Sequence, residues 1–361
     1  MLDAAASSSG SQADLSSRAA PRRVWGSFAL YLGGLALLAA AFLVFARHAG
    51  EAVVAALAAA GLGAFWPVPY HALPLTLDAL GWRSLIRLRP EHPEAASVPY
   101  LFWVASIREA VGSVLPVVRI GGEVAGVHLV TRRGLPLAFA TATVVVEVTV
   151  TLLSQIVLAL FGFVLLAVFV GRGSLFVHAL PAVAVALAIV GIFVLFQHGG
   201  LVGFCGRALR RLTGLGVLAG KNGDTAAEID RDIRAIYRRG SALLWCFAGQ
   251  IAGLLVGAGE VWIALRLMGH PVDPLDAVIL EAGVQALRTG GFFVPGALGI
   301  QEMGLVFLGG VLGLPADLML AVSVLKRLRE IVYGGFALLS WQWVEGRRFW
   351  PRRRAPSMES P

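Results

Sequence analysis

The chain has 361 residues, of which 57% are hydrophobic and only 14% are charged. Soluble domains average about 45–50% apolar and about 25% charged residues, so this composition excludes an ordinary soluble protein and indicates a membrane protein. The formal net charge of +8 arises from arginines and lysines that gather in a few loops between apolar segments. That distribution is typical of cytoplasmic loops that face anionic lipids, so we expect membrane lipids and not nucleic acid as partners.

The N-terminal part predicts a tail and two membrane-directed elements. Residues 1–22 are rich in alanine, serine and polar residues, and we expect a disordered cytoplasmic tail there. The apolar run at 24–46 is longer than that of a cleaved signal peptide and long enough to cross a bilayer, so we predict an uncleaved first span. Three prolines divide residues 52–86, which predicts a short half-helix followed by a span at about 70–86.

Two further segments, residues 97–131 and 275–313, are apolar but hold several charges each. A lipid-facing helix would not carry them, because charge and irregular backbone at membrane depth persist only inside protein or along a wet cavity. We therefore predict two re-entrant hairpins. The first is expected to break at Pro116 and at Gly121-Gly122.

The remaining apolar segments, at 175–196, 241–267 and 318–344, predict further spans. The run at 135–170 fits one tilted or broken span, or two packed spans. The polar loop at 207–240 contains isoleucines spaced for one face of a helix, which predicts a short amphipathic helix on the cytoplasmic surface. These residues are Ile229, Ile233 and Ile236.

Taken in order, these elements predict an all-α, polytopic helical membrane protein with about six to eight spans and, in addition, two re-entrant broken-helix segments. The density of lysine and arginine places both termini in the cytoplasm. We expect one transmembrane domain at residues 23–345 and a basic cytoplasmic tail at 346–361. The two cysteines and the histidines, His71 among them, show no metal-ligand spacing, so we expect no metal and no cofactor.

A sequence motif occurs twice at a fixed offset. Pro116 and Pro295 are 179 residues apart, and so are Glu123 and Glu302 and the Gly-Leu-Pro sequences that begin at residues 134 and 313. Chance agreement in a Gly/Pro-rich membrane sequence is the alternative to a true duplication. The predicted spans bring the two copies in from opposite faces, so we expect an inverted repeat with halves at about 97–171 and 276–345, as in many transporters.

The intramembrane charges suggest three ion pairs: Arg108 with Glu123, Arg288 with Glu302, and Glu147 with Lys326. Such pairs would either bind substrate or only hold the hairpins together. The cluster at 326–330 would be a cationic wall for a lipid phosphate, or an interfacial cluster that reaches toward water. Gln250 and Glu260 would line a cavity or, more simply, bond neighbouring helices.

We expect no catalytic residue. The candidate substrate-binding residues are Arg108, Glu109, Pro116, Arg119, Glu123, Glu147, Arg288, Pro295, Gln301, Glu302, Lys326, Arg327 and Glu330.

The repeat residues carry a family resemblance. Residues 108–123, 293–302 and 326–330 resemble the lysylphosphatidylglycerol synthase transmembrane-region family, whose members are also called flippase-like, and within it the hopanoid-biosynthesis-associated branch. The resemblance implies a lipid translocator or a lipid-handling accessory in the bacterial inner membrane. The chain ends shortly after the last predicted span, so we expect neither the soluble aminoacyl-transfer domain of two-domain members nor lysyl transfer.

Three functions remain open at this stage. A lipid flippase fits the inverted repeat and the intramembrane charges. A non-catalytic scaffold for lipid-biosynthesis enzymes is the alternative. An intramembrane lipid-modifying enzyme would need paired acids and bases, but we find no nucleophile arrangement or nucleotide loop. The arginine and lysine content fits an anionic phospholipid at least as well as the polyol headgroup of a hopanoid.

Overall fold

The protein is an all-α helical membrane protein. The computed structural model describes residues 61–114, 120–169, 224–290 and 299–349 and a few isolated positions, and the regular elements in these ranges are all helical. Two of the described helices, Leu137–Leu166 and Gly240–Leu267, are long and apolar enough to cross a bilayer. The spans predicted at 24–46 and 175–196, and the N-terminal tail, lie outside the described residues apart from isolated positions.

The first half of the described chain begins with a 3-10 turn, η1 (Gly61–Phe65). The helices that follow are α4 (Pro67–Tyr70), α5 (Ala72–Ile86), α6 (Val98–Val114), α7 (Ile120–Thr131) and α8 (Leu137–Phe169). The predicted break before the second span is confirmed. Because α8 is one continuous helix of 33 residues, the alternative of two packed spans is wrong. Gly121-Gly122 lie in the first turn of α7, so the predicted break at these glycines is wrong, and the predicted break at Pro116 lies outside the described residues.

The second half consists of α11 (Asp224–Tyr237), α12 (Gly240–Leu267), α13 (Pro274–Gly290), α14 (Ile300–Val311) and α15 (Ala316–Phe349). The helix α15 continues past the predicted end of the last span at residue 344. The amphipathic helix is confirmed as α11. Its isoleucines are buried and it packs mainly against α8, so within the described structure its apolar face meets protein.

The duplicated sequence folds into the same local structure twice. The helices α8 and α15 begin at Leu137 and Ala316, which are 179 residues apart. The glycines of the two Gly-Leu-Pro turns, Gly134 and Gly313, have φ angles of 86° and 78°, a left-handed conformation that glycine adopts without strain. Each donates its N–H to the carbonyl three residues earlier, at 3.0 and 3.2 Å.

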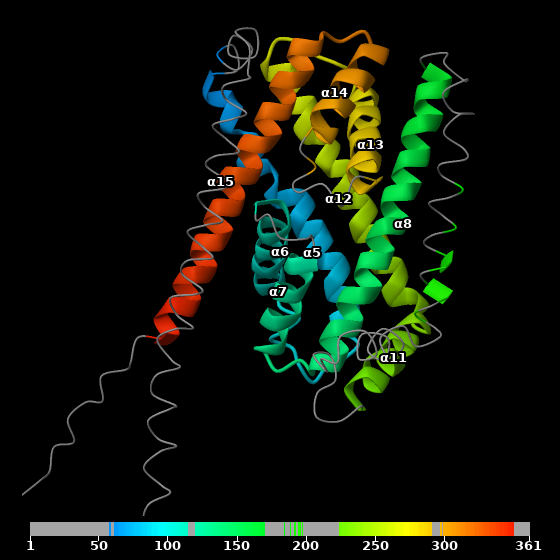
Figure 1. Ribbon diagram of the computed structural model, residues 1–361, viewed down its shortest axis with the longest axis vertical. Helices are drawn as coiled ribbons and strands as arrows, with labels where there is room; N and C mark the ends of the chain where they lie inside the picture. Colours follow the sequence, from blue (N-terminus) through cyan, green and yellow to red (C-terminus); the bar gives the residue numbers. More distant parts are fainter. Residues whose placement is uncertain are drawn as a thin grey trace, which may run out of the picture.

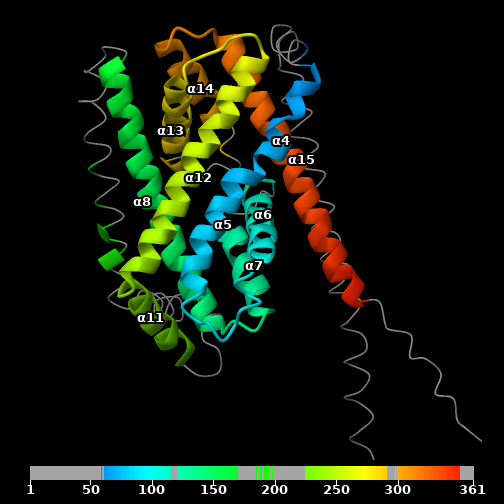
Figure 2. The same ribbon diagram turned by 180° about the vertical axis from the view of Figure 1, so that it is seen from behind.

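The two copies point in opposite directions. In Figures 1 and 2 the α6–α7 hairpin occupies the lower half of the bundle and the α13–α14 hairpin the upper half. The helix α8 runs upward and α15 downward. The helices α7 and α14 have 12 residues each, or about 18 Å, whereas the hydrocarbon core of a bilayer is about 30 Å thick. The halves therefore form an inverted pair of half-length hairpins.

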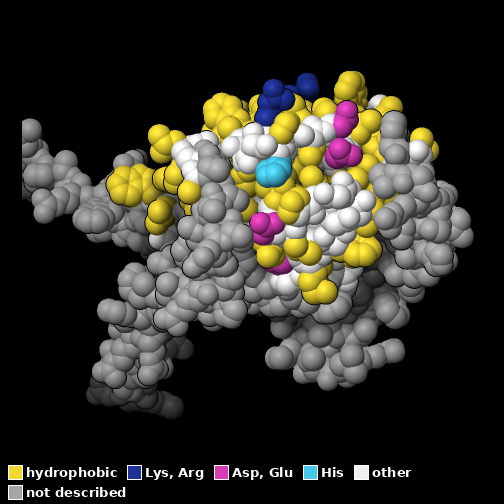
Figure 3. Space-filling view, turned by 90° about the horizontal axis from the view of Figure 1, so that it is seen from above, with side chains coloured by type: hydrophobic (Ala, Val, Ile, Leu, Met, Phe, Trp, Pro, Cys, Tyr) yellow, Lys and Arg dark blue, Asp and Glu magenta, His cyan; other side chains and the backbone are white. Residues whose placement is uncertain are grey.

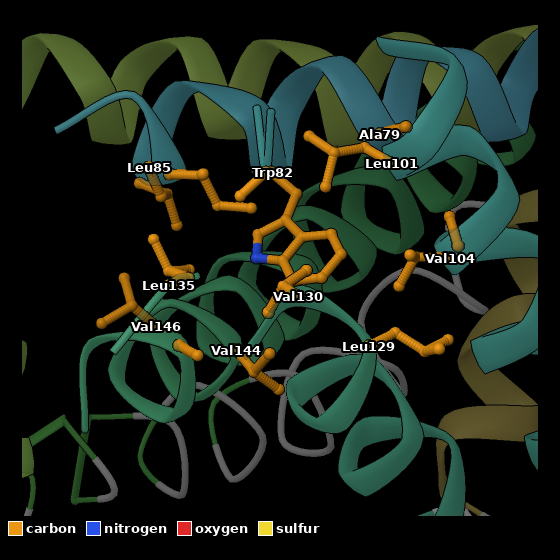
Figure 4. Close-up of a cluster of buried hydrophobic side chains, with 14 of the residues drawn as sticks. Ala79, Trp82, Leu85, Leu101, Val104, Leu129, Val130, Leu135, Val144 and Val146 are labelled. Carbon is orange, nitrogen blue, oxygen red and sulfur yellow. The ribbon is translucent and has the colours of Figure 1, made fainter. Parts of the chain in front are cut away.

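The lower half has its own apolar core around Trp82 of α5. This side chain is fully buried among side chains of α5 to α8, including Leu101, Leu129 and Val144 (Figure 4). Its indole N–H donates to Oγ1 of Thr143 at 3.3 Å. Viewed onto the opposite, upper end, the described surface is largely apolar, with acidic and basic side chains in small groups (Figure 3).

Helices α5 and α12 approach closely along a line of glycines. A Cβ atom placed on Gly249 would lie 2.7 Å from the Cα of Gly81 and 2.8 Å from the carbonyl oxygen of Leu77. Gly253, one turn later, faces the carboxylate of Asp78. Glycines spaced by four allow helix backbones in membranes to touch, which is a main source of packing energy where water is absent.

Replacing Gly249 with alanine is expected to destabilise the protein by about 1–3 kcal/mol, because the new methyl group meets backbone atoms that cannot rotate away. Gly257→Ala on the same helix is the matched control, since nothing lies within 4 Å of its added Cβ. Thermal unfolding of the purified protein in one detergent compares the two. Equal melting temperatures would contradict the close approach.

Candidate functional site

Arg108 joins the helices of the first hairpin to α8. Its Nη2 forms ion pairs with Glu123 of α7 and, at 2.7 Å, with Glu147 of α8. The guanidinium lies 4.6 Å above the ring of Trp82. A Cβ on Gly122 would clash with the carbonyl of Arg108, so a glycine is needed where α7 crosses α6. The predicted pair of Arg108 with Glu123 is confirmed, and Glu147 completes the Arg108 cluster.

The second hairpin meets α15 through two arginines. Arg288 of α13 lies 3.1 Å from Glu330 and donates to Gln301 at 2.7 Å. Arg327 contacts Glu330 at 2.9 Å and Glu302 at 3.2 Å. The predicted pair of Arg288 with Glu302 is therefore wrong, because each takes its ion-pair partner from α15.

The pair of Glu147 with Lys326 is also wrong. Lys326 bonds Glu281 of α13 at 2.5 Å, and Glu147 bonds Arg108, so each charge is neutralised within its own half of the bundle. Lys326, Arg327 and Glu330 are all buried. The alternative that the 326–330 cluster lies at the membrane interface and reaches toward water is therefore also wrong, since none of these three side chains extends to the surface.

His71 lies at the centre of the charges, although its lone position in the sequence suggested no role. It sits between α4 and α5, with Nε2 2.7 Å from Glu109 and Nδ1 2.6 Å from Glu260. Arg329 of α15 contacts the same ring and lies 3.2 Å from Glu260. The sequence did contain a signal for His71: it is an ionisable residue within a segment that prolines interrupt, and such groups at membrane depth are usually functional.

These contacts form one continuous set, which we call the central network. Its members are His71, Glu109, Glu260, Arg288, Gln301, Glu302, Ser323, Arg327, Arg329 and Glu330. His71 lies directly before α5, and the other members come from α6, α12, α13, α14 and α15, so both hairpins contribute. Of the predicted residues, Pro116, Arg119 and Pro295 lie outside the described residues.

The repeat is chemically unequal at two positions. Glu109 and Arg288 are 179 residues apart, and so are Glu147 and Lys326, and in each case the charge is reversed. Glu109 and Glu123 are the most accessible charges of the site, with side chains 33% and 34% exposed, whereas Arg288 is 16% exposed. A ligand that enters would thus meet carboxylates of the first half and an arginine of the second.

The break between α13 and α14 is strained at one residue. Ala297 has a φ of 49°, which a residue with a Cβ rarely adopts. Arg327 donates to its carbonyl at 3.3 Å and helps to hold this conformation. Within the described ranges, no three or more His, Cys, Asp or Glu residues are placed to hold a metal ion. The site's chemistry there is that of ion pairs and hydrogen bonds.

Reversing the Lys326–Glu281 pair tests whether this contact forms. Lys326→Glu alone places two buried carboxylates together and is expected to destabilise the protein by about 3–5 kcal/mol. Adding Glu281→Lys restores opposite charges and should recover much of the loss. Thermal unfolding of the wild type, the single variant and the double variant provides the measurement. A double variant less stable than Lys326→Glu would mean that the two side chains do not interact.

Comparison with known proteins agrees with these features. The family model described as the lysylphosphatidylglycerol synthase TM region matches residues 11–335, which include both hairpins and all of the central network. The match does not distinguish the hopanoid-associated branch. No curated protein and no solved structure matches the chain. Because the family model covers most of the sequence, the chain belongs to the family of lysylphosphatidylglycerol synthase transmembrane regions.

Proposed function

We propose that the protein moves a lipid between the two leaflets of the bacterial inner membrane, with its headgroup passing through the central network. The observation that carries this proposal is the meeting of two oppositely directed, half-length hairpins at buried charges. In a membrane the two hairpins would be re-entrant. Pseudo-symmetric halves of this kind can expose one central site to either face in turn. Membership of a family that handles membrane lipids supports the choice of ligand.

The site fits a headgroup that carries phosphate. Arg288 is the most exposed of the network's arginines, and it lies near the tip of the second hairpin. Guanidinium groups bind phosphate oxygens through paired hydrogen bonds, which suits recognition of a phospholipid. The ion pair with Glu330 would neutralise Arg288 between turnovers. A hopanoid is the second lipid class, proposed from the resemblance of the repeat motifs.

The arrangement of the chain in the membrane belongs to the same proposal. We propose that residues 23–345 form one transmembrane domain and that both termini and the 207–240 loop are cytoplasmic, as the distribution of lysine and arginine indicates. The lower end in Figure 1, which holds α11 and the connection between α7 and α8, would then face the cytoplasm. We propose no enzymatic activity for this domain.

The experiment is lipid transfer in vesicles that contain the purified protein. Fluorescent analogues of an anionic phospholipid, a zwitterionic phospholipid and a hopanoid are followed from one leaflet to the other. Arg288→Gln is expected to slow transfer of the substrate about tenfold or more, because a hydrogen bond to a charged group contributes about 1.5–3 kcal/mol. Arg266→Gln, an exposed arginine at the end of α12, is the matched control.

Two outcomes would contradict the proposal. Transfer no faster than in empty vesicles for all three lipids would exclude translocation. Equal transfer by the Arg288→Gln and Arg266→Gln variants, with both folded, would place the headgroup path elsewhere. Stable co-purification of lipid-biosynthesis enzymes in the first case would favour the scaffold function instead.

A further inference from the structure

The two contacts of His71 require two hydrogens. Its Nε2 lies 2.7 Å from a carboxylate oxygen of Glu109, and its Nδ1 lies 2.6 Å from one of Glu260. Two acceptor atoms do not approach this closely without a hydrogen between them. A neutral imidazole has one N–H, and a carboxylate has none. The second hydrogen must therefore be an added proton.

The charge balance of the central network also indicates one added proton. It contains four carboxylates but three guanidinium groups. The carboxylates are Glu109, Glu260, Glu302 and Glu330, and the guanidiniums are Arg288, Arg327 and Arg329. An unbalanced charge at membrane depth is costly, and one proton on His71 makes the described network neutral.

The surroundings of His71 are consistent with a proton held there. The charged or titratable groups that face it are Tyr70, Asp78, Glu109, Glu260, Arg329 and Tyr333. Tyr70 donates its hydroxyl hydrogen to the carbonyl of Val256, so it does not compete for the imidazole. The rings of Tyr333 and His71 meet edge to face, with their centroids 5.1 Å apart. The Nη1 of Arg329 contacts Nδ1 and lies 3.1 Å from Nε2, so on a protonated ring this donor has no acceptor there and repels the positive charge, whereas both flanking carboxylates attract it.

The two carboxylates differ in access. The side chain of Glu109 is 33% exposed, whereas that of Glu260 is 4% exposed. A proton can therefore reach the imidazole through Glu109, while Glu260 fixes the ring from the sealed side. The repeat position equivalent to Glu109 is Arg288, which cannot exchange a proton at ordinary pH. At this repeat position the residue of the first half can pass a proton to the network, and the residue of the second half cannot.

We propose that Glu109, His71 and Glu260 form a proton-binding site, with the proton on His71, and that its occupancy is coupled to headgroup binding at Arg288 in the same network. The coupling rests on the lipid movement proposed above, whereas the proton site does not. A phosphate bound at Arg288 adds negative charge to the network that holds the imidazolium and favours retention of the proton. By linkage, loss of the proton then favours release of the headgroup.

Nitrogen NMR of the full chain with isotope-labelled histidine, in phospholipid nanodiscs, tests the proton site. The His71 signals are those lost in His71→Gln, and His270→Gln, in the exposed connection between α12 and α13, removes different ones. We expect both ring nitrogens of His71 to carry a hydrogen near neutral pH, and one of them to lose it in Glu260→Gln. A single N–H on His71 in the wild type would overturn the site.

The coupling is tested in vesicles that hold a pH-sensitive dye and a labelled lipid. An imposed pH gradient is expected to change the rate of lipid transfer severalfold and to dissipate faster when transfer occurs. Lipid transfer that ignores the gradient would overturn the coupling and leave the proposed function standing. Absence of any transfer would overturn both the proposed function and the coupling, and the NMR result would still decide the proton site.

Discussion

Replacing Arg108 with glutamine is expected to lower the free energy of unfolding by about 3–5 kcal/mol, because the change leaves the buried carboxylate of Glu147 without its cation. Glu123 and Glu147 both pair with this guanidinium, and Glu147 is 5% exposed. The cation–π contact with Trp82 is lost as well. Chemical or thermal unfolding in nanodiscs provides the measurement.

Two further variants serve as comparisons for Arg108→Gln. Arg132→Gln breaks a partly exposed pair with Glu345 and should cost no more than about 1 kcal/mol. Adding Glu147→Gln to Arg108→Gln removes one stranded charge and should recover part of the stability. If Arg108→Gln proved as stable as Arg132→Gln, the Arg108 cluster would not be buried as described.

Replacing Glu330 with glutamine is expected to be similarly costly, at about 3–5 kcal/mol, since this carboxylate is the common partner of three arginines. It lies 3.1 Å from Arg288, 2.9 Å from Arg327 and 3.7 Å from Arg329. The neutral amide leaves the positive charges facing one another between α13 and α15. Both the melting temperature and the rate of lipid transfer should fall.

The control for Glu330 lies on the same helix. Glu345→Gln removes a carboxylate near the end of α15 whose ion-pair partner among the described residues is Arg132, and a change of less than about 1 kcal/mol is expected. The double variant Glu330→Gln/Arg327→Gln should be more stable than Glu330→Gln alone, since it removes one of the stranded cations. Glu330→Gln behaving like Glu345→Gln would show that α15 does not link the hairpins through this residue.

The fold was predictable from the sequence because hydropathy and the 179-residue offset are local or periodic properties. The prolines, glycines and charges of 97–131 and 275–313 were enough to predict two hairpins, and the Gly-Leu-Pro sequences helped to reveal that they are copies of one repeat. The length of α8 could not be fixed, since an apolar run of this size fits one long helix or two shorter ones equally well.

The pairing of charges was only partly predictable. Arg108 and Glu123 pair because they face each other across one short hairpin, where sequence proximity is informative. The partners of Arg288 and Glu302 come from α15, and that depends on how helices far apart in the sequence pack together. His71 was missed for the same reason: its two carboxylate partners are 38 and 189 residues away.

The most direct measurement concerns the opposite direction of the two halves. In a background with Cys205 and Cys246 changed to alanine, Arg133→Cys labels the exposed turn before α8 and Asp317→Cys labels the exposed start of α15. An impermeant maleimide is applied to right-side-out and to inverted membrane vesicles. We predict that each orientation allows modification of only one of the two cysteines, and a different one in each. Modification of both from the same face would contradict the inverted repeat and, with it, the meeting of the two hairpins at the central network.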